Sequence, residues 1–113
     1  MYKKELEIAK KAARQAGKYL GKEFLLWSRG KASYKTDREL VTKCDKQAEK
    51  IIFSYIKKAF PKYAILSEES GLLDKKSDYF WVVDPLDGTT NFTNHLPIFT
   101  SSISLFYKKE VVL

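Results

Sequence analysis

Apolar residues recur at steps of three and four through the first 60 positions, and this helical period constrains the fold more than any other feature. It predicts one amphipathic helix over residues 2–28 and a second over residues 42–60, which Pro61 ends. Thr42 and Asp45 are spaced like a capping box at the start of the second helix. The two apolar stripes are made of Leu6, Ala9, Ala13, Ala16, Leu20, Phe24 and Trp27, and of Ala48, Ile51, Ile52, Tyr55, Ile56, Ala59 and Phe60. The chain is therefore expected to begin with two long helices that each present one apolar face.

Beyond residue 61 the pattern changes to short apolar runs rich in aromatic and β-branched residues, which are typical of strands. Strands are predicted over residues 63–67, 79–84, 100–107 and from residue 110 onward. The predicted fold class is α/β, with the two N-terminal helices packed on an antiparallel sheet. The last run has no turn or polar tail behind it, which predicts that these 113 residues are the first part of a longer fold.

The length and composition allow one domain. A chain of 113 residues with 44% hydrophobic side chains can bury one core. The single cysteine, Cys44, excludes an internal disulfide and a zinc site built from several cysteines. No run approaches the roughly 20 apolar residues of a membrane helix, so a cytoplasmic protein without membrane contact is expected.

The net charge of +7 is unevenly distributed along the chain. Residues 1–62 contain 17 Lys and Arg against 7 Asp and Glu, whereas residues 63–113 contain 4 against 7. Basic residues on helices usually form a solvated face. Two more specific roles for this charge are contact with a polyanion such as RNA and the attraction of an anionic substrate.

Carboxylates stand at the ends of several predicted elements. Asp45 lies near the start of the second helix, Glu68 and Glu69 follow the first strand, and Asp84 and Asp87 follow the second. Strand ends that meet at one edge of a sheet bring such side chains together, and a divalent cation relieves their mutual repulsion. The alternative is that EES and DPLDG are an ordinary loop and turn.

The residues between and after the two aspartates fit a metal and phosphate site. Pro85 fixes the backbone, so that the carbonyl of Leu86 can turn inward as an oxygen ligand. Gly88, Thr89 and Thr90 are predicted to begin a helix whose free N–H groups face an anion. A metal beside a phosphate is the arrangement that hydrolysis of a phosphate ester requires.

These motifs also carry a resemblance. WVVDPLDGTTNF at 81–92 resembles the signature of the inositol monophosphatase family of magnesium-dependent, lithium-sensitive phosphatases, and LVTKCD at 40–45 and LSEES at 66–70 resemble its two upstream motifs. The match runs from about residue 35 to residue 106. The resemblance implies a sugar-phosphatase-like fold with α/β/α/β/α layers, of which these residues form the N-terminal metal- and phosphate-binding portion.

The resemblance also implies roles for individual residues. Glu68 resembles a metal-ligating glutamate, and Asp84 resembles the aspartate that bridges two metals. Leu86 resembles the residue that gives its backbone carbonyl, and Asp87 resembles the ligand of the second metal. The implied cofactor is Mg²⁺, with two or three ions.

Three further positions complete the implied site. Thr89 resembles the partner of Glu68 in orienting and deprotonating the attacking water. Asp45 resembles the carboxylate that serves a third, weaker metal through water. Gly88 and Thr89, with Thr90 beside them, would give backbone donors to the substrate phosphate.

The resemblance implies that the protein is a hydrolase, namely a phosphoric monoester hydrolase that acts on inositol monophosphate-like substrates. Members of the family usually form homodimers. Fructose 1,6-bisphosphate and 3'-phosphoadenosine 5'-phosphate are alternative substrates within the superfamily. A second hypothesis is a non-catalytic role in binding RNA or the transcription machinery through basic residues such as Lys10, Lys11, Arg14 and Lys18. A third hypothesis is that the chain is an inactive fragment.

The sequence departs from the family in its length. Members are longer than 113 residues, and their second half supplies another metal-ligating aspartate and most of the groups that recognise the substrate alcohol. Whether these residues hydrolyse a substrate by themselves is therefore left open. Lys35 resembles a lysine of the active-site loop, and His95 is expected to be a structural or surface residue.

Overall fold

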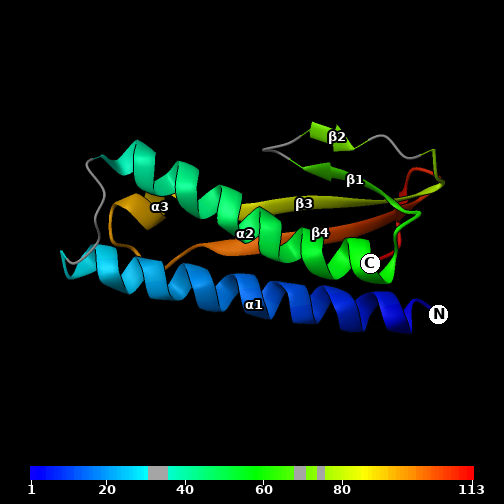
Figure 1. Cartoon of the computed structure of the whole chain (residues 1–113), viewed down its shortest axis with the longest axis horizontal. Helices are drawn as coiled ribbons and strands as arrows, with labels where there is room; N and C mark the ends of the chain where they lie inside the picture. Colours follow the sequence, from blue (N-terminus) through cyan, green and yellow to red (C-terminus); the bar gives the residue numbers. More distant parts are fainter. Residues whose placement is uncertain (31–35, 68–70, 74–75) are drawn as a thin grey trace.

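Two long antiparallel helices cover one face of a mixed β-sheet in the computed structural model, which describes residues 1–30, 36–67, 71–73 and 76–113 (Figure 1). Helix α2 packs along β3 and helix α1 along β4. The sheet order is β2-β1-β3-β4-β5. The elements are α1 (Lys3–Ser28), α2 (Asp37–Ala59), β1 (Ala64–Ser67), β2 (Gly71–Leu73), β3 (Tyr79–Asp87), α3 (Thr89–Thr93), β4 (Thr100–Tyr107) and β5 (Glu110–Val111).

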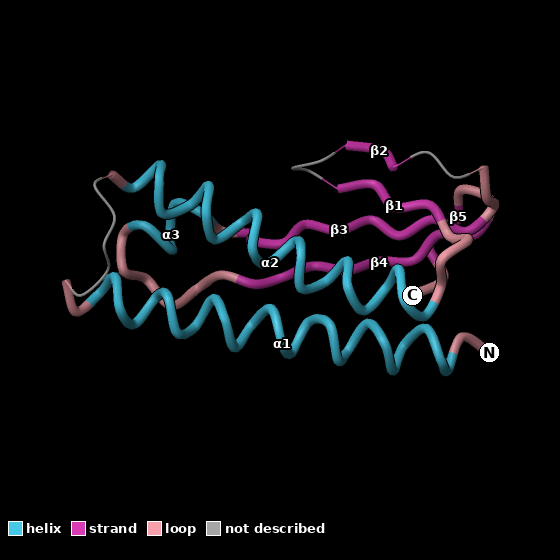
Figure 2. The backbone as a smooth tube through the Cα atoms, in the orientation of Figure 1, coloured by secondary structure: helices cyan, strands magenta, loops and turns pink. Residues whose placement is uncertain are grey.

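The predicted fold class is confirmed, but the sheet is not wholly antiparallel. Strand β1 runs parallel to β3, and β1–β2, β3–β4 and β4–β5 are the antiparallel pairs. The short edge strand β2, which the sequence did not predict, reverses the chain after β1 (Figure 2). The chain then crosses back to the other side of β1, so β3 runs in the same direction as β1.

Helix α2 begins earlier than predicted. Thr36 is its N-cap, and the backbone N–H of Glu39 donates to Thr36 Oγ1 at 3.1 Å. The capping pair therefore lies at Thr36 and Glu39, and the predicted start at Thr42 is wrong. The extra turns bring Leu40 into the core, where it is fully buried.

The core lies between the two helices and one face of the sheet. Trp81 and Leu105 of the central strands are fully buried there, against Leu20 of α1 and Ile52 of α2. Burial of each such side chain contributes about 1.5–3 kcal/mol. Because side chains alternate along a strand, the neighbouring residues Phe80, Val82 and Phe106 point to the opposite face of the sheet.

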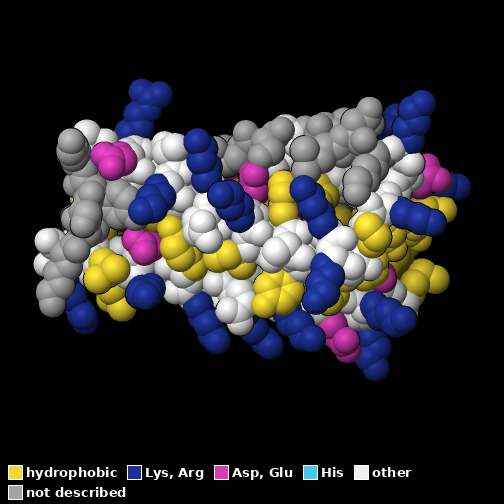
Figure 3. All heavy atoms as spheres, in the orientation of Figure 1, with side chains coloured by type: hydrophobic (Ala, Val, Ile, Leu, Met, Phe, Trp, Pro, Cys, Tyr) yellow, Lys and Arg dark blue, Asp and Glu magenta, His cyan; other side chains and the backbone are white. Residues whose placement is uncertain are grey.

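The outer surface of the helices is rich in basic side chains. Figure 3 shows Lys and Arg spread over α1 and α2, with fewer Asp and Glu among them. None of the helices in the described ranges is long and apolar enough to cross a membrane.

Candidate functional site

A β-bulge near the end of β3 determines where the two aspartates of the DPLDG motif point. Asp84 pairs with Ser102 and Asp87 pairs with Thr100, so three steps on β3 correspond to two steps on β4. Ser102 and Thr100 lie on the same face of β4, because side chains alternate. The extra residue therefore brings Asp84 and Asp87 to one face of the sheet, the face opposite the helices.

Pro85 and Ser101 maintain this bulge. Pro85 has no N–H to donate to the ladder, and Ser101 Oγ donates to the Pro85 carbonyl oxygen at 2.8 Å. Leu86 is buried, with 2% of its surface exposed, so its side chain anchors the bulge in the core. The backbone carbonyl of Leu86 as a metal ligand stays a prediction.

Gly88 makes the turn between the strand and α3. It is the N-cap of α3 and has φ 88° and ψ 39°, a left-handed conformation that suits glycine. A Cβ at this position would lie 2.9 Å from the Ile98 carbonyl oxygen and 3.2 Å from Phe99 Cα. The same Ile98 carbonyl accepts a hydrogen bond from Asn91 Nδ2 at 2.9 Å. The close approach of two backbone segments thus fixes where the following helix starts.

Helix α3 is anchored by aromatic contacts. Phe92 is fully buried, and its ring centroid lies 4.9 Å from that of Phe99 and 5.8 Å from that of Phe24 on α1. The indole N–H of Trp27 donates to the Thr93 carbonyl at 3.1 Å. These contacts hold the helix, and with it Thr89 and Thr90, in a fixed position relative to α1.

His95 takes part in the same anchoring. Its ring stacks on Trp27 with 5.7 Å between centroids, and its Nδ1 lies 3.3 Å from Ser28 Oγ. Both contacts are with the end of α1. They fit the expected structural role of this residue.

Thr89 and Thr90 line a small hollow between α3 and the first turns of α2. The hollow has a volume of about 250 Å³, and α2 lines it with Asp37, Arg38, Val41 and Thr42. A guanidinium group can bind phosphate oxygens in a bidentate manner. Arg38 is therefore a candidate phosphate-binding residue that the sequence did not single out. The only signal was its place two residues before the LVT motif.

A buried polar pair fixes the end of β1. Ser67 Oγ donates to Glu49 Oε2 at 2.6 Å, and the two residues are 2% and 8% exposed. Ser67 directly precedes Glu68 in the LSEES motif. Glu49 is therefore a positioning residue that the sequence did not indicate. The predicted ligand Glu68 lies outside the described residues, as do Glu69, Ser70 and Lys35.

Asp45 and Cys44 lie side by side on the buried face of α2. Asp45 is 6% exposed, and Cys44 is fully buried. Burial raises the pKa of the Cys44 thiol to about 11, and a hydrogen bond from Tyr19 offsets part of this rise. The thiol is therefore protonated at neutral pH and is not a nucleophile.

The donors present suit Mg²⁺ but form only part of a site. Asp84 and Asp87 present carboxylate oxygens on one face, and Mg²⁺ prefers oxygen ligands. The Oδ1 atom of Asp84 is buried, whereas Asp87 is exposed. Within the ranges that the structure describes, no three Asp, Glu, His or Cys side chains come together closely enough to hold a metal ion. A complete site would need further ligands, of which Glu68 is one candidate.

Comparison with known proteins gives consistent matches. The sequence model of the inositol monophosphatase family matches residues 1–113. The Nus factor SuhB of Escherichia coli strain K12 is 44% identical over 104 residues, a match that covers 91% of this chain and 39% of SuhB. The Nus factor SuhB of Pseudomonas aeruginosa is 40% identical over 106 residues, with the same two coverages. The chain thus spans about two fifths of the length of the curated relatives it matches.

Solved structures resemble the fold over the same part. The extragenic suppressor protein suhB of Bartonella henselae superposes with a TM-score of 0.78 at 35% identity, covering 95% of this chain and 40% of that structure. The inositol monophosphatase of Anabaena superposes with a TM-score of 0.77 at 35% identity, covering 96% and 37%. In both cases nearly all of this chain is matched and the larger part of the known structure has no counterpart in it.

Proposed function

Because the chain belongs to the inositol monophosphatase family, we propose that residues 1–113 form the N-terminal metal- and phosphate-binding portion of a magnesium-dependent phosphomonoesterase. The observation that carries this proposal is the register across the β3 bulge, which brings Asp84 and Asp87 to one face beside the Gly88 turn. Two carboxylates on one face can bind metal ions, and the start of α3 beside them can bind the phosphate of an ester.

The tasks of the site are divided among its residues, and Glu68 and Thr89 each have two. Asp84 and Asp87, with the Leu86 carbonyl and Glu68, would hold Mg²⁺, and Asp45 would serve a further ion. Bound Mg²⁺ neutralises the ester and lowers the pKa of the attacking water. Thr89 and Glu68 orient that water and accept its proton.

The phosphate is held by donors from two helices. The backbone N–H groups of Gly88, Thr89 and Thr90 lie where the first turn of a helix leaves donors without an intrahelical acceptor. Arg38, across the hollow that Thr89 and Thr90 line, adds a positive charge. The proposed substrates are inositol monophosphate-like, and the cytoplasmic location, homodimer and lithium sensitivity are carried over from the family resemblance.

The first test is a magnesium titration of this chain followed by thermal melting. Wild type and Asp84→Asn are compared with a matched control, Asp78→Asn, which changes an exposed carboxylate just before β3. At a Mg²⁺ concentration ten times Kd, binding adds roughly 1.4 kcal/mol to the free energy of unfolding and raises Tm by about 4–6 °C. The rise is expected in wild type and Asp78→Asn and is expected to be lost in Asp84→Asn. An equal rise in all three proteins would contradict the assignment of Asp84.

A second test concerns the reaction itself. Release of inorganic phosphate from inositol 1-phosphate is measured for this chain and for a longer chain that adds the remainder of a relative. Activity in the longer chain that depends on Asp84 would support the phosphomonoesterase. Magnesium binding without activity in either chain would instead favour an inactive fragment.

A second function is favoured by the relatives and by the charge of α1. Relatives at 40–44% identity are named Nus factor, and Lys10, Lys11, Arg14 and Lys18 of this chain are all exposed. This function is contact with the transcription machinery through basic helices. Binding to purified RNA polymerase carrying a nascent transcript should depend on these four residues and should be independent of Asp84. Equal binding by a variant in which all four are glutamine would contradict it.

A further inference from the structure

A groove between the two long helices combines cationic and aromatic side chains. It has a volume of about 440 Å³, within the range of roughly 300–1,000 Å³ that is typical of small-molecule pockets. Lys18, Tyr19 and Lys22 line it from α1, and Ser54 and Tyr55 line it from α2. Its lining residues Lys18, Lys22 and Ser54 are exposed, so the groove is open to solvent. Asp84 and Asp87 lie elsewhere, on the sheet face that points away from the helices.

The lysines of the groove belong to a longer cationic ridge on α1. Lys10, Arg14, Lys18 and Lys22 recur every four residues, and all four are exposed. Residues four apart lie one above the other on a helix, so the ridge is continuous for about 18 Å. A ridge of this length can follow several consecutive phosphates of an extended strand.

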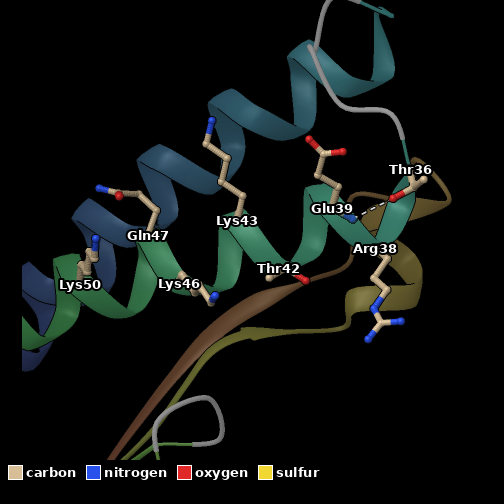
Figure 4. Close-up of a pocket in the computed structure, with 8 residues that line it drawn as sticks. All are labelled: Thr36, Arg38, Glu39, Thr42, Lys43, Lys46, Gln47 and Lys50. Atoms are coloured by element: carbon tan, nitrogen blue, oxygen red, sulfur yellow. Dashed lines mark hydrogen bonds between the residues drawn. The ribbon is translucent and has the colours of Figure 1, made fainter.

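The second helix adds to the positive surface because two of its four acids point inward, whereas Asp37 and Glu39 of its first turn are exposed. Asp45 and Glu49 are 6% and 8% exposed, and Glu49 is hydrogen-bonded to Ser67 of the sheet. The outward side of α2 instead carries lysines on successive turns. Figure 4 shows Lys43, Lys46 and Lys50 along a second groove of about 630 Å³. The outer layer is therefore more positive than the composition of α2 indicates.

The two tyrosines give the groove flat apolar surfaces between these charges. Tyr19 and Tyr55 both line the groove, and both are half-buried. The hydroxyl of Tyr19 bonds the Cys44 thiol, which limits the rotation of this ring. Rings that stack on bases, beside cations that bind phosphates, are the usual means of holding single-stranded nucleic acid.

We infer that the outer face of α1 and α2 binds single-stranded nucleic acid, with a base held between Tyr19 and Tyr55 and the flanking phosphates bound by Lys18 and Lys22. A duplex fits this groove poorly, because its bases are stacked inside and present no free ring face. The inference rests on the second function proposed above and names its partner class and its site. It is independent of the phosphomonoesterase, because none of these residues belongs to that site.

Fluorescence anisotropy with a labelled oligouridylate of about 12 nucleotides tests the inference directly. Binding is measured between about 50 and 200 mM KCl, where log K falls with log salt by about 0.7 per phosphate contacted on a single strand. The double variant Lys18→Gln/Lys22→Gln should lower this slope by about 1.4. The control Lys108→Gln/Lys109→Gln removes two exposed charges at the β4–β5 turn and should leave the slope unchanged. An oligothymidylate of equal length distinguishes DNA from RNA.

Variants of the tyrosine test base stacking. Tyr55→Leu should weaken binding about 5- to 150-fold, and Tyr55→Phe, which keeps the ring, should bind within about twofold of wild type. Circular dichroism melting checks that both variants fold. Equal loss from the control double variant, or binding by folded Tyr55→Leu within about twofold of wild type, would overturn the inference.

The RNA polymerase binding experiment distinguishes failure of the nucleic-acid inference from failure of the second proposed function. If oligouridylate binding does not depend on the groove but the α1 variant still loses polymerase, the partner of the basic face is a protein. The second function then stands and the nucleic-acid inference is wrong. If neither binding depends on these residues, both are wrong.

Discussion

Replacing Gly88 by alanine tests the geometry of the turn on which the candidate site depends. Gly88 has φ 88°, and a left-handed backbone costs an alanine about 1–2 kcal/mol. The added Cβ would also lie 2.9 Å from the Ile98 carbonyl oxygen, and overpacking of this kind costs typically about 1–3 kcal/mol. Alanine reduces the entropy of the unfolded chain, which offsets about 0.4–1 kcal/mol. The free energy of unfolding should therefore fall by about 2–4 kcal/mol.

Gly30→Ala is the matched control. Gly30 has φ 66°, but a Cβ there would meet no atom of the described residues within 4 Å. The control has the same left-handed backbone strain and the same loss of entropy in the unfolded chain. It should therefore lower the free energy of unfolding by only about 1 kcal/mol. The difference between the two variants isolates the contact with Ile98, and we expect it to be about 1–3 kcal/mol.

Urea unfolding followed by tryptophan fluorescence measures both variants. The midpoints should differ while the m-values agree, because the surface exposed on unfolding is the same. Thermal melting gives a second readout, at about 4 °C per kcal/mol for a domain of this size. If Gly88→Ala costs no more than Gly30→Ala, then the two backbone segments are not in close contact. The position of α3 would then need another explanation.

Two further predictions concern buried groups on α2. Ser67→Ala removes the 2.6 Å hydrogen bond to the buried carboxylate of Glu49 and should lower the free energy of unfolding in urea by about 1.5–3 kcal/mol. The control Ser54→Ala removes an exposed hydroxyl of α2 and should change the free energy of unfolding by less than about 0.5 kcal/mol. Equal costs would contradict the buried pair. Burial raises the pKa of Cys44 from 9.0 to about 11, so above pH 9 the unfolded state binds fewer protons than the native state. The free energy of unfolding should fall as the pH rises from about 9 to 11, and Cys44→Ala should flatten this decline. If Cys44→Ala shows the same decline as wild type, the raised pKa of the Cys44 thiol is refuted.

The helices and most strands could be predicted because their pattern is local. Apolar spacing located α1 to within a residue and found four of the five strands in the described part of the chain. Two features were not predicted, each for a different reason. The parallel pairing of β1 with β3 follows from a three-residue edge strand that has too few positions to show alternation. The start of α2 was misplaced because the Thr36–Glu39 pair precedes the apolar stripe that marked the helix.

The candidate site divides in the same way. The spacing of Asp84 and Asp87 around a proline is visible in the sequence. On a regular strand, two residues three positions apart point to opposite faces. The bulge adds one residue between them, and this brings both side chains to the same face. The roles of Arg38 and Glu49 were not visible. Each depends on an element later in the chain: Arg38 lines a hollow together with Thr89, and Glu49 accepts a hydrogen bond from Ser67. No local pattern marks such contacts.

The arrangement of layers makes the two proposed functions separable by mutation. Asp84 and Asp87 occupy the face of the sheet that points away from the helices, and Lys18 and Tyr55 occupy the groove between the helices. Residues in distant sites without shared partners usually act additively, so changes at one site should leave the other unaffected. Arg38 and Thr42 are exceptions, because both line the hollow at Thr89 and also the lysine groove on α2. If a variant of Arg38 lost both phosphate-ester hydrolysis and nucleic-acid binding, the position of Arg38 between the two sites would explain the loss. Such a result would not show that the two functions share one site.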